Sequence, residues 1–295
     1  MMVREPIVAG RFYPGAEDDC RADLEQRIPT QPDLSAVPGY PVGAIVPHAG
    51  WMCSGGVAGG VFAAIAQRRS PSTFVLFGAA HMAAAHTAAI FSEGAWETPL
   101  GRIEVDQRLA ERICSQTNLI QADAYAHETE HSIEVQLPFV QHLFPDARIV
   151  PIVVPPSPAA HEVGQAVART VASYAADVFL VGSTDLTHYG PQYHFTPEGT
   201  GPEGVRWAKE VNDRRLIDLM TEMEFDQIVS EAAAHHNACG AGAVAATIAA
   251  CKQLGADQAV VLEHTTSSEV LGGQGVGSMA DSVGYVGMVF GRPTP

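Results

Sequence analysis

Short apolar runs alternate with helical stretches along most of this chain. The apolar runs, rich in β-branched and aromatic residues, are Val42–Val46, Thr73–Gly78, Arg148–Val154, Asp177–Val181, Gln258–Glu263 and Val283–Phe290. They lack alternation between apolar and polar residues, which indicates strands that are buried on both faces. The helical stretches are Gly56–Gln67, Asp106–Cys114, Ser132–Phe144, Ala159–Ala175, Val205–Met223 and Gly240–Leu254. This order predicts an α/β fold, a three-layer α/β/α domain with a largely parallel or mixed central sheet.

Three segments between these elements are expected to be loops. Pro29–Pro41 carries four prolines and is expected to wrap the surface as an arm. Gly190–Gly204 is rich in Gly and Pro and could cover a site, and Ser267–Asp281 is expected to connect the last two strands. No internal repeat is visible and nothing forces a second domain, so residues 1–295 are expected to form one domain.

Composition excludes several kinds of partner and location. The formal net charge of −16, from 33 acidic and 17 basic side chains, would repel a polyanion, so nucleic acid is not an expected partner. The five cysteines include no C-x-x-C pair, which favours a reducing compartment. Residues 34–67 carry no charged side chain, but prolines and glycines interrupt them, so no membrane span is expected. With no apolar leader at the N-terminus, we expect a cytoplasmic protein.

Three histidines follow predicted strands. His48, His81 and His188 come shortly after the first, second and fourth apolar runs. In open α/β sheets, ligands bind in the crevice beyond the carboxyl ends of the strands. If these strands are parallel neighbours, the three imidazoles converge there. If they are not, each is an ordinary loop histidine.

One cysteine stands at the start of a predicted helix. Cys239 directly precedes the helical stretch that begins at Gly240. The positive end of the helix dipole lowers the pKa of a thiol and favours thiolate, the form that binds metal or attacks an electrophile. Cys251 lies on the apolar face of the same stretch and is expected to be an inert core residue.

Two other motif matches are discounted. Residues 127–131 (H-E-T-E-H) fit the H-E-x-x-H pattern of zinc proteases, but the preceding residues 121–126 show no apolar helical face. Residues 240–245 (G-A-G-A-V-A) imitate a dinucleotide fingerprint, but no strand precedes them. We therefore expect neither a zinc protease nor a nucleotide cofactor.

Six motifs together resemble one known family. They are A-G-R-F-Y-P at 9–14, P-H-A-G at 47–50, G-A-A-H at 78–81, H-S-I-E-V-Q-L-P-F at 131–139, S-T-D-L-T-H-Y-G at 183–190 and N-A-C-G at 237–240. In this order they resemble the Memo family, also called AmmeMemoRadiSam system protein B, from about residue 5 to residue 290. The resemblance implies a fold similar to class III extradiol dioxygenases, the LigB-like non-haem iron enzymes.

The resemblance also implies a metal centre. His48, His81 and Cys239 match the metal ligands of the family, with cysteine where the dioxygenases place a glutamate. Two histidines plus one anionic ligand, with positions left open, is the facial-triad arrangement of Fe(II) oxygenases. Thiolate makes the site softer, so Fe(II) is the expected metal and copper or zinc is also compatible.

Further residues are expected around the metal. His188 matches the acid/base histidine of the dioxygenases, and Asp185 the acidic residue close to it. Substrate contacts are expected from His131, Glu134, Trp51 and Tyr189.

Three functions remain open at this stage. The first is an iron-dependent, dioxygenase-like oxidoreductase that acts on a small aromatic or phenolic substrate. The second is a metal-binding module that binds a peptide or partner protein and catalyses nothing. The third is a thiol hydrolase or transferase that uses Cys239, His188 and Asp185 without metal. The family name adds AMMECR1-like and radical-SAM proteins as expected partners, and a homodimer also stays open.

Overall fold

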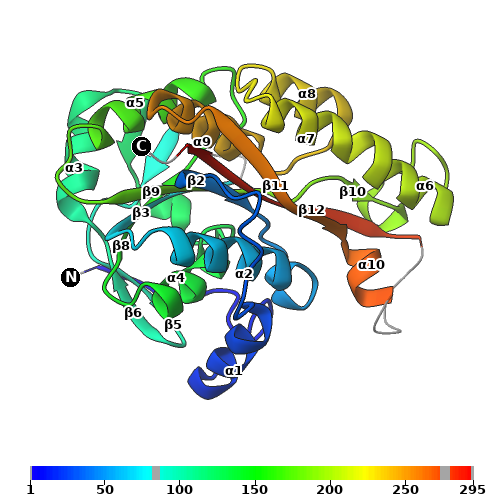
Figure 1. Ribbon diagram of the computed structural model, residues 1–295, viewed down its shortest axis with the longest axis horizontal. Coiled ribbons are helices and arrows are strands. Elements are labelled where there is room, and N and C mark those ends of the chain that lie inside the picture. The colour runs from blue at the N-terminus through cyan, green and yellow to red at the C-terminus, as the bar shows by residue number, and fades with distance from the viewer. Residues whose placement is uncertain (1, 82–86, 273–279, 294–295) are drawn as a thin grey trace.

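A large mixed sheet forms the middle layer of the molecule (Figure 1). The computed structural model describes residues 2–81, 87–272 and 280–293. The strands of this sheet are β2 (Tyr40–Val46), β3 (Thr73–Gly78), β4 (Ala88–Ile90), β7 (Ile120–Ala122), β8 (Arg148–Val153), β9 (Val178–Ser183), β10 (His188–Tyr189), β11 (Gln258–Thr266) and β12 (Ser282–Arg292). Their order is β10-β12-β2-β9-β3-β8-β4-β7, with β11 paired to β12.

The centre of the sheet is parallel. Strands β2, β9, β3 and β8 run in one direction, whereas β12 beside β2 and β4 beside β8 are antiparallel to their neighbours. In β3, Phe74 and Leu76 join one hydrophobic core, and Val75 and Phe77 join the other. Apolar side chains therefore point to both faces, which explains why these strands lack alternation in the sequence. The predicted mixed α/β sheet is confirmed.

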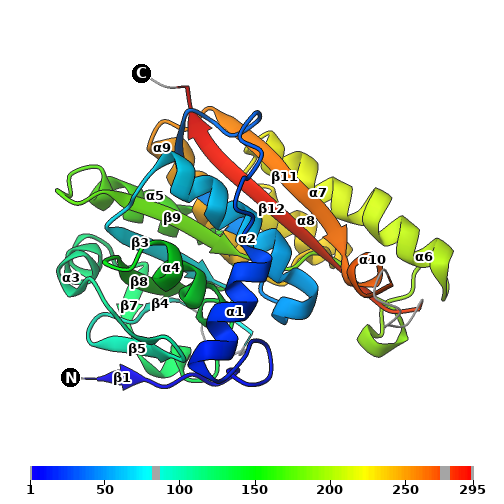
Figure 2. The same ribbon diagram turned by 60° about the horizontal axis from the view of Figure 1, so that its bottom comes forward.

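Helices cover both faces of the sheet, as Figure 2 shows from a second direction. One core includes residues of α3 (Gln107–Gln116), α5 (Ala160–Val171), α7 (Arg214–Thr221), α8 (Ile228–His235) and α9 (Ala241–Gln253). The other core includes residues of α1 (Glu17–Arg27), α2 (Trp51–Arg68) and α4 (Leu137–Leu143). Although α2 occupies the charge-free stretch, none of the helices described is both long and apolar enough to cross a membrane. The three-layer α/β/α prediction is thus confirmed.

Helix α9 lies against the middle of the sheet. It contacts β2, β3 and β9, and it also packs closely against α5. Its residues from Ala241 to Cys251 are all buried. Small residues make this close packing feasible, because a Cβ at Gly164 of α5 would collide with the carbonyl oxygen of Ala246.

The N-terminal segment contributes a strand to a second, smaller sheet. A small sheet with the order β1-β5-β6 is formed by β1 (Val3–Arg4), β5 (Ala95–Thr98) and β6 (Gly101–Glu104). Between the larger elements lie the short 3₁₀ helices η1 (Tyr125–His127), η2 (Glu134–Gln136) and η3 (Pro191–Tyr193). These short strands and helices were not expected from the sequence, since runs of two to four residues carry little periodicity.

Two predicted helices differ from the observed ones. The helix expected over Ser132–Phe144 is a turn followed by η2 and only then α4, whose Pro138 suits the first turn of a helix. The helix expected over Val205–Met223 consists of α6 (Pro202–Trp207), the π-helical η4 (Ala208–Asp213) and α7. A side-chain pattern cannot reveal such a local change in hydrogen bonding.

The three expected loops have different outcomes. Residues 29–39 are without helix or strand, but Tyr40 and Pro41 already belong to β2. Residues 190–204 contain η3, the start of α6 and an isolated bridge between Gly190 and Phe195. The prediction for Ser267–Asp281 is wrong at its start, because residues Ser267–Gly272 form α10. Residues 273–279 of that segment lie outside the described residues.

Candidate metal centre

The carboxyl ends of three neighbouring parallel strands place the candidate residues at one edge of the sheet. In the order β2-β9-β3, Val46 is paired with Ser183, and Gly78 ends β3 beside them. The segments that follow these strands carry His48, Asp185 and His81 respectively. This is the crevice in which open α/β sheets bind ligands.

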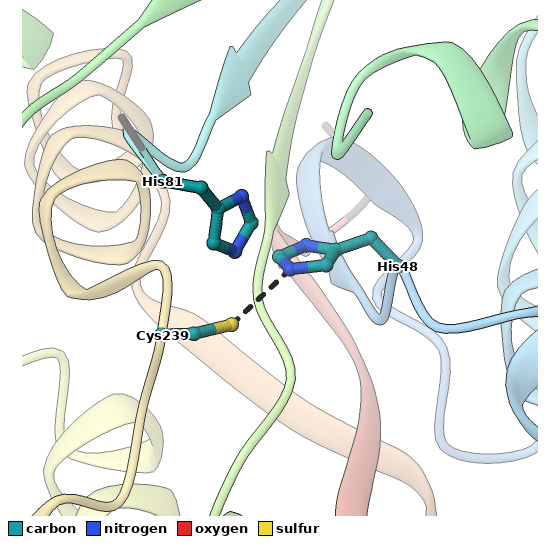
Figure 3. Close-up of side chains that lie close together, drawn as sticks. All are labelled: His48, His81 and Cys239. Atoms are coloured by element: carbon teal, nitrogen blue, oxygen red, sulfur yellow. Dashed lines mark hydrogen bonds between the residues drawn. The ribbon is translucent and has the colours of Figure 1, made fainter. Parts of the chain in front are cut away.

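His48, His81 and Cys239 point toward one another in this crevice (Figure 3). One ligand atom from each lies within 4.8 Å of the others. His48 Nε2 is 3.1 Å from Cys239 Sγ, and the two imidazole rings are perpendicular, with centroids 5.1 Å apart. Two nitrogens and one sulfur at this spacing could hold a single metal ion on one side and leave other positions open.

The His48 imidazole is buried and kept neutral. His48 is 2% exposed, and its Nδ1 lies 2.9 Å from Ser183 Oγ. Burial, together with the nearby His81 and His131 rings, lowers the pKa of His48 well below its ordinary value. Neutral imidazole is the form that binds a metal.

The His81 imidazole is held by a buried carboxylate. Its Nδ1 lies 3.0 Å from both side-chain oxygens of Glu130. Burial alone would lower the pKa of His81, but the hydrogen bond and charge of Glu130 raise it above the ordinary value. Burial would conversely raise the pKa of Glu130, but hydrogen bonds from His81 and from the Ser132 amide hold it well below its ordinary range. In the sequence, Glu130 is only a spacer residue of the discounted H-E-x-x-H match at residues 127–131.

The thiol of Cys239 does not have the lowered pKa expected from its place before a helix. Gly240 is indeed the N-cap of α9, but burial raises the pKa of Cys239, and the neighbouring Asp185 raises it further. The Asp185 amide donates to Sγ at 3.3 Å. Because burial favours the protonated thiol, a metal ion would have to displace its proton.

Asp185 and His188 lie beside these three residues. Asp185 is 4% exposed and accepts a hydrogen bond of 2.7 Å from the His48 amide. Burial raises the pKa of Asp185 and lowers that of His188. The Nε2 atom of His188 is buried and has no hydrogen-bond partner within the described part of the chain. Ligand atoms of Asp185, His188 and Cys239 also lie within 4.8 Å of one another.

A pocket of about 500 Å³ opens over this group. It is lined by Phe12, His48, Ala49, Gly50, Cys53, His81, His131, Asp185, His188, Gln192, Tyr193, Ser267, Leu271, Asp281, Val283 and Tyr285. Another cavity lies beside Arg102 and Arg148, but none of the candidate ligands lines it. The pocket over the histidines therefore brings a cavity and the candidate ligands together.

Of the four residues expected to contact substrate, only His131 lines this pocket. Its ring stacks on His81, with centroids 4.7 Å apart and planes at 16°. Glu134 is fully buried elsewhere, where it pairs with Arg4. The Trp51 indole donates to the Val135 carbonyl.

The fourth residue, Tyr189, donates its hydroxyl hydrogen bond to the Gly199 carbonyl. Part of the pocket wall was not predicted from the sequence: it is formed by Phe12, Cys53, Tyr193 and Tyr285. Phe12 lies in the first of the recognised motifs and Tyr193 in the loop expected to cover a site, so these two carried a signal. Cys53 and Tyr285 carried none.

Neither discounted motif has the geometry of the site that it imitates. His127 is fully buried, with Nε2 donating to the Ala89 carbonyl, and η1 ends at this residue, so His127 and His131 do not share a helix. Helix α8, not a strand, precedes the glycine-rich start of α9.

Comparisons with known proteins agree on one group of relatives. The family model described as Memo-like protein matches residues 4–289. A MEMO1 family protein of Pyrobaculum aerophilum is 33% identical, covering 99% of this chain and 100% of its own. One of Methanothermobacter thermautotrophicus is 35% identical, covering 92% and 96%. An uncharacterized protein of Escherichia coli K12 shares 11% identity and a TM-score of 0.49 over 84% of this chain and 99% of its own, too weak a likeness to add to the fold described above.

Proposed function

The chain belongs to the Memo family, and from that premise we propose that it binds one Fe(II) ion through His48, His81 and Cys239. We propose further that it is a dioxygenase-like oxidoreductase acting on a small aromatic or phenolic substrate. The observation that carries the proposal is the convergence of three ligand atoms within 4.8 Å, at a pocket that also holds an unpartnered imidazole nitrogen.

The donor set supports iron. Two imidazoles and one anionic group match the requirement for a metal that keeps open positions. Bound Fe(II) would supply the redox chemistry and the positions for dioxygen and a substrate hydroxyl. Copper and zinc accept the same donors, so metal identity is part of the test. A reducing compartment such as the cytoplasm would keep Cys239 and the other four free cysteines as thiols.

The residues around the centre have complementary tasks. His188 Nε2 could accept a proton from a substrate hydroxyl, because no group of the described residues forms a hydrogen bond with it. Phe12, Val283 and Tyr285 line the pocket with apolar surface on which an aromatic ring can pack. Acid/base work by His188 is needed because a phenol is mostly protonated near neutral pH.

The thiol hydrolase has less support. The imidazole hydrogen-bonded to Cys239 is that of His48, and within the described residues no hydrogen bond joins Cys239 to His188. Burial also raises the pKa of the thiol, which disfavours a metal-free nucleophile. Both observations suit a ligand better than a nucleophile.

The proposal is tested first by metal content. Anaerobically purified protein should bind close to one equivalent of Fe(II), and His48→Ala or His81→Ala should lose tight binding. His161→Ala on α5 is the matched control, since its ring packs on Phe225 away from the pocket. Equal iron content in the wild type and both site variants, measured by elemental analysis, would rule out the centre.

Oxygen uptake then separates an enzyme from a binding module. The iron-loaded wild type should consume dioxygen with a phenolic or catecholic substrate. His188→Ala should keep its iron and lose about 10²- to 10⁴-fold in rate. A loaded protein that consumes no dioxygen across such a panel would support a metal-binding module that catalyses nothing.

A further inference from the structure

The segment between η1 and α4, residues 128–136, forms hydrogen bonds to His81 and to Ser183, the residue that contacts His48 Nδ1. Glu130 is 1% exposed and accepts hydrogen bonds from the His81 amide at 3.0 Å and the Ser132 amide at 2.8 Å. Backbone N–H groups can only donate, so both carboxylate oxygens act as acceptors. The His81 Nδ1, 3.0 Å from each of them, must therefore carry the proton. That leaves the lone pair of neutral His81 on Nε2.

A similar argument applies to His48 through a hydroxyl group. Ser183 Oγ has one proton, and it lies 2.9 Å from the Ser132 carbonyl oxygen, which can only accept. The side-chain amide of Gln136 donates toward the same Oγ at 3.3 Å. With its proton used in this way, Ser183 accepts from His48 Nδ1 at 2.9 Å. The lone pair of His48 is then on Nε2, which faces Cys239 Sγ.

The same segment also fixes the turns that carry the two histidines. Ser132 Oγ accepts from the Ala79 amide at 2.9 Å, two residues before His81. Gln136 Nε2 donates to the Pro47 carbonyl at 2.8 Å, next to His48. These contacts give the H-S-I-E-V-Q motif a role that metal ligation alone leaves unexplained.

The segment is itself anchored by a second buried acid, Glu134. Glu134 accepts from the Ile7 and Val8 amides and from the Tyr13 hydroxyl, and it forms an ion pair with Arg4. A segment held at this many points can act as a rigid support for the histidines.

We propose that Glu130 and Ser183 are positioning residues that set the Nδ1–H tautomers of His81 and His48, so that both Nε2 lone pairs face one point. The inference deepens the proposed function and rests on it for the role of that point as a metal centre. Neutral imidazole in water favours the opposite, Nε2–H tautomer, which would aim a proton at the ion. Hydrogen-bond acceptors behind a ligating histidine are therefore worth about 10- to 100-fold in metal affinity.

The tautomers can be read directly in the metal-free protein. Nitrogen-15 NMR of imidazole-labelled protein at about pH 9, where neutral rings prevail, distinguishes the two protonated nitrogens. In the wild type, both His48 and His81 should show protonated Nδ1. Glu130→Ala should shift His81 toward the Nε2–H form and leave His48 unchanged, and Ser183→Ala should do the reverse. A wild-type protein with either ring in the Nε2–H form overturns the inference even if a variant fails to fold.

Glu128→Ala is the matched control. It removes an exposed carboxylate two residues from Glu130 and should change neither ring. Competition between the protein and a chromophoric chelator for Zn(II) should show about 10- to 100-fold weaker binding in Glu130→Ala and Ser183→Ala, and none of this loss in Glu128→Ala. Unchanged tautomers and unchanged Zn(II) affinity in both variants contradict the inference. If both rings show the stated tautomers but the protein binds neither Zn(II) nor Fe(II), the orienting role of Glu130 and Ser183 stands and the metal centre is rejected.

Discussion

At the scale of single residues, contacts decide what a buried cysteine can do. Cys239 lies just before helix α9 and Cys251 lies within it, and burial raises the pKa of both thiols. Cys239 Sγ lies against His48 Nε2, whereas Cys251 is fully buried within an apolar core. A metal beside Cys239 could replace the thiol proton, whereas no group of candidate ligands among the described residues includes Cys251.

The thiolate ligand has an optical signature. Thiolate donates charge strongly, so protein loaded with Cu(II), or with iron oxidised to Fe(III), should show a visible charge-transfer band. Cys239→Ser should remove the band and weaken metal binding, while Cys251→Ala should leave the band unchanged. An absorption spectrum that is the same in Cys239→Ser and the wild type would show that the sulfur is not a ligand.

At the scale of elements, close helix packing positions the loop that carries Cys239. Helix α5 presses on α9 at Gly164, where a side chain would meet the backbone of Ala246. Pro155 presents its carbonyl oxygen in the same way to Gly242, near the start of α9. These contacts fix the position of α9, and with it Cys239, relative to α5 and the segment that follows β8.

Two Gly→Ala substitutions, one inside this contact and one outside it, isolate the effect of the packing on the free energy of unfolding. Gly164→Ala should lower the free energy of unfolding by about 1–3 kcal/mol, because the new methyl group collides with backbone that cannot rotate away. Gly56→Ala on α2 meets nothing within 4 Å and should be neutral or stabilising by up to about 1 kcal/mol. Urea unfolding measures both. Equal effects of the two changes would mean that the α5–α9 contact can relax without cost.

At the scale of the whole molecule, the N-terminal strand joins distant parts of the chain. Arg4 of β1 donates to the carbonyl oxygens of His127 and Glu130 and pairs with Glu134. It thereby ties the small sheet to the segment behind the candidate ligands. His127 packs beside Phe91 and Trp96 in this junction, with no room for a hydrated charge.

His127 makes global stability depend on pH. Burial lowers the pKa of His127 from 6.5 to about 4. Between these values the unfolded chain binds the proton and the folded protein does not, so stability falls as the pH is lowered from 6.5 toward 4. The loss from this group approaches about 3 kcal/mol at the acid end.

The contribution of His127 to this pH dependence is obtained by comparing the wild type with a variant that cannot titrate at this position. His127→Gln keeps a donor for the Ala89 carbonyl but does not titrate, so its free energy of unfolding should fall less steeply over this range than that of the wild type. Urea unfolding at several pH values compares the two proteins, and it cancels the contributions of other buried histidines. Parallel curves would show that His127 is protonated as readily in the folded protein as in the unfolded chain.

Hydrophobic pattern and motif order were enough to predict the layers, the long strands of the sheet and the histidines at its edge. Strands such as β3 are readable because both of their faces are buried, and His48 and His81 because they follow such strands. The role of Glu130 could not be predicted, since an acid among charged neighbours becomes a histidine partner only when the chain brings β3 beside it. The protonation of Cys239 was also decided by tertiary structure, because the burial and the neighbouring Asp185 that raise its pKa cannot be read from the local sequence.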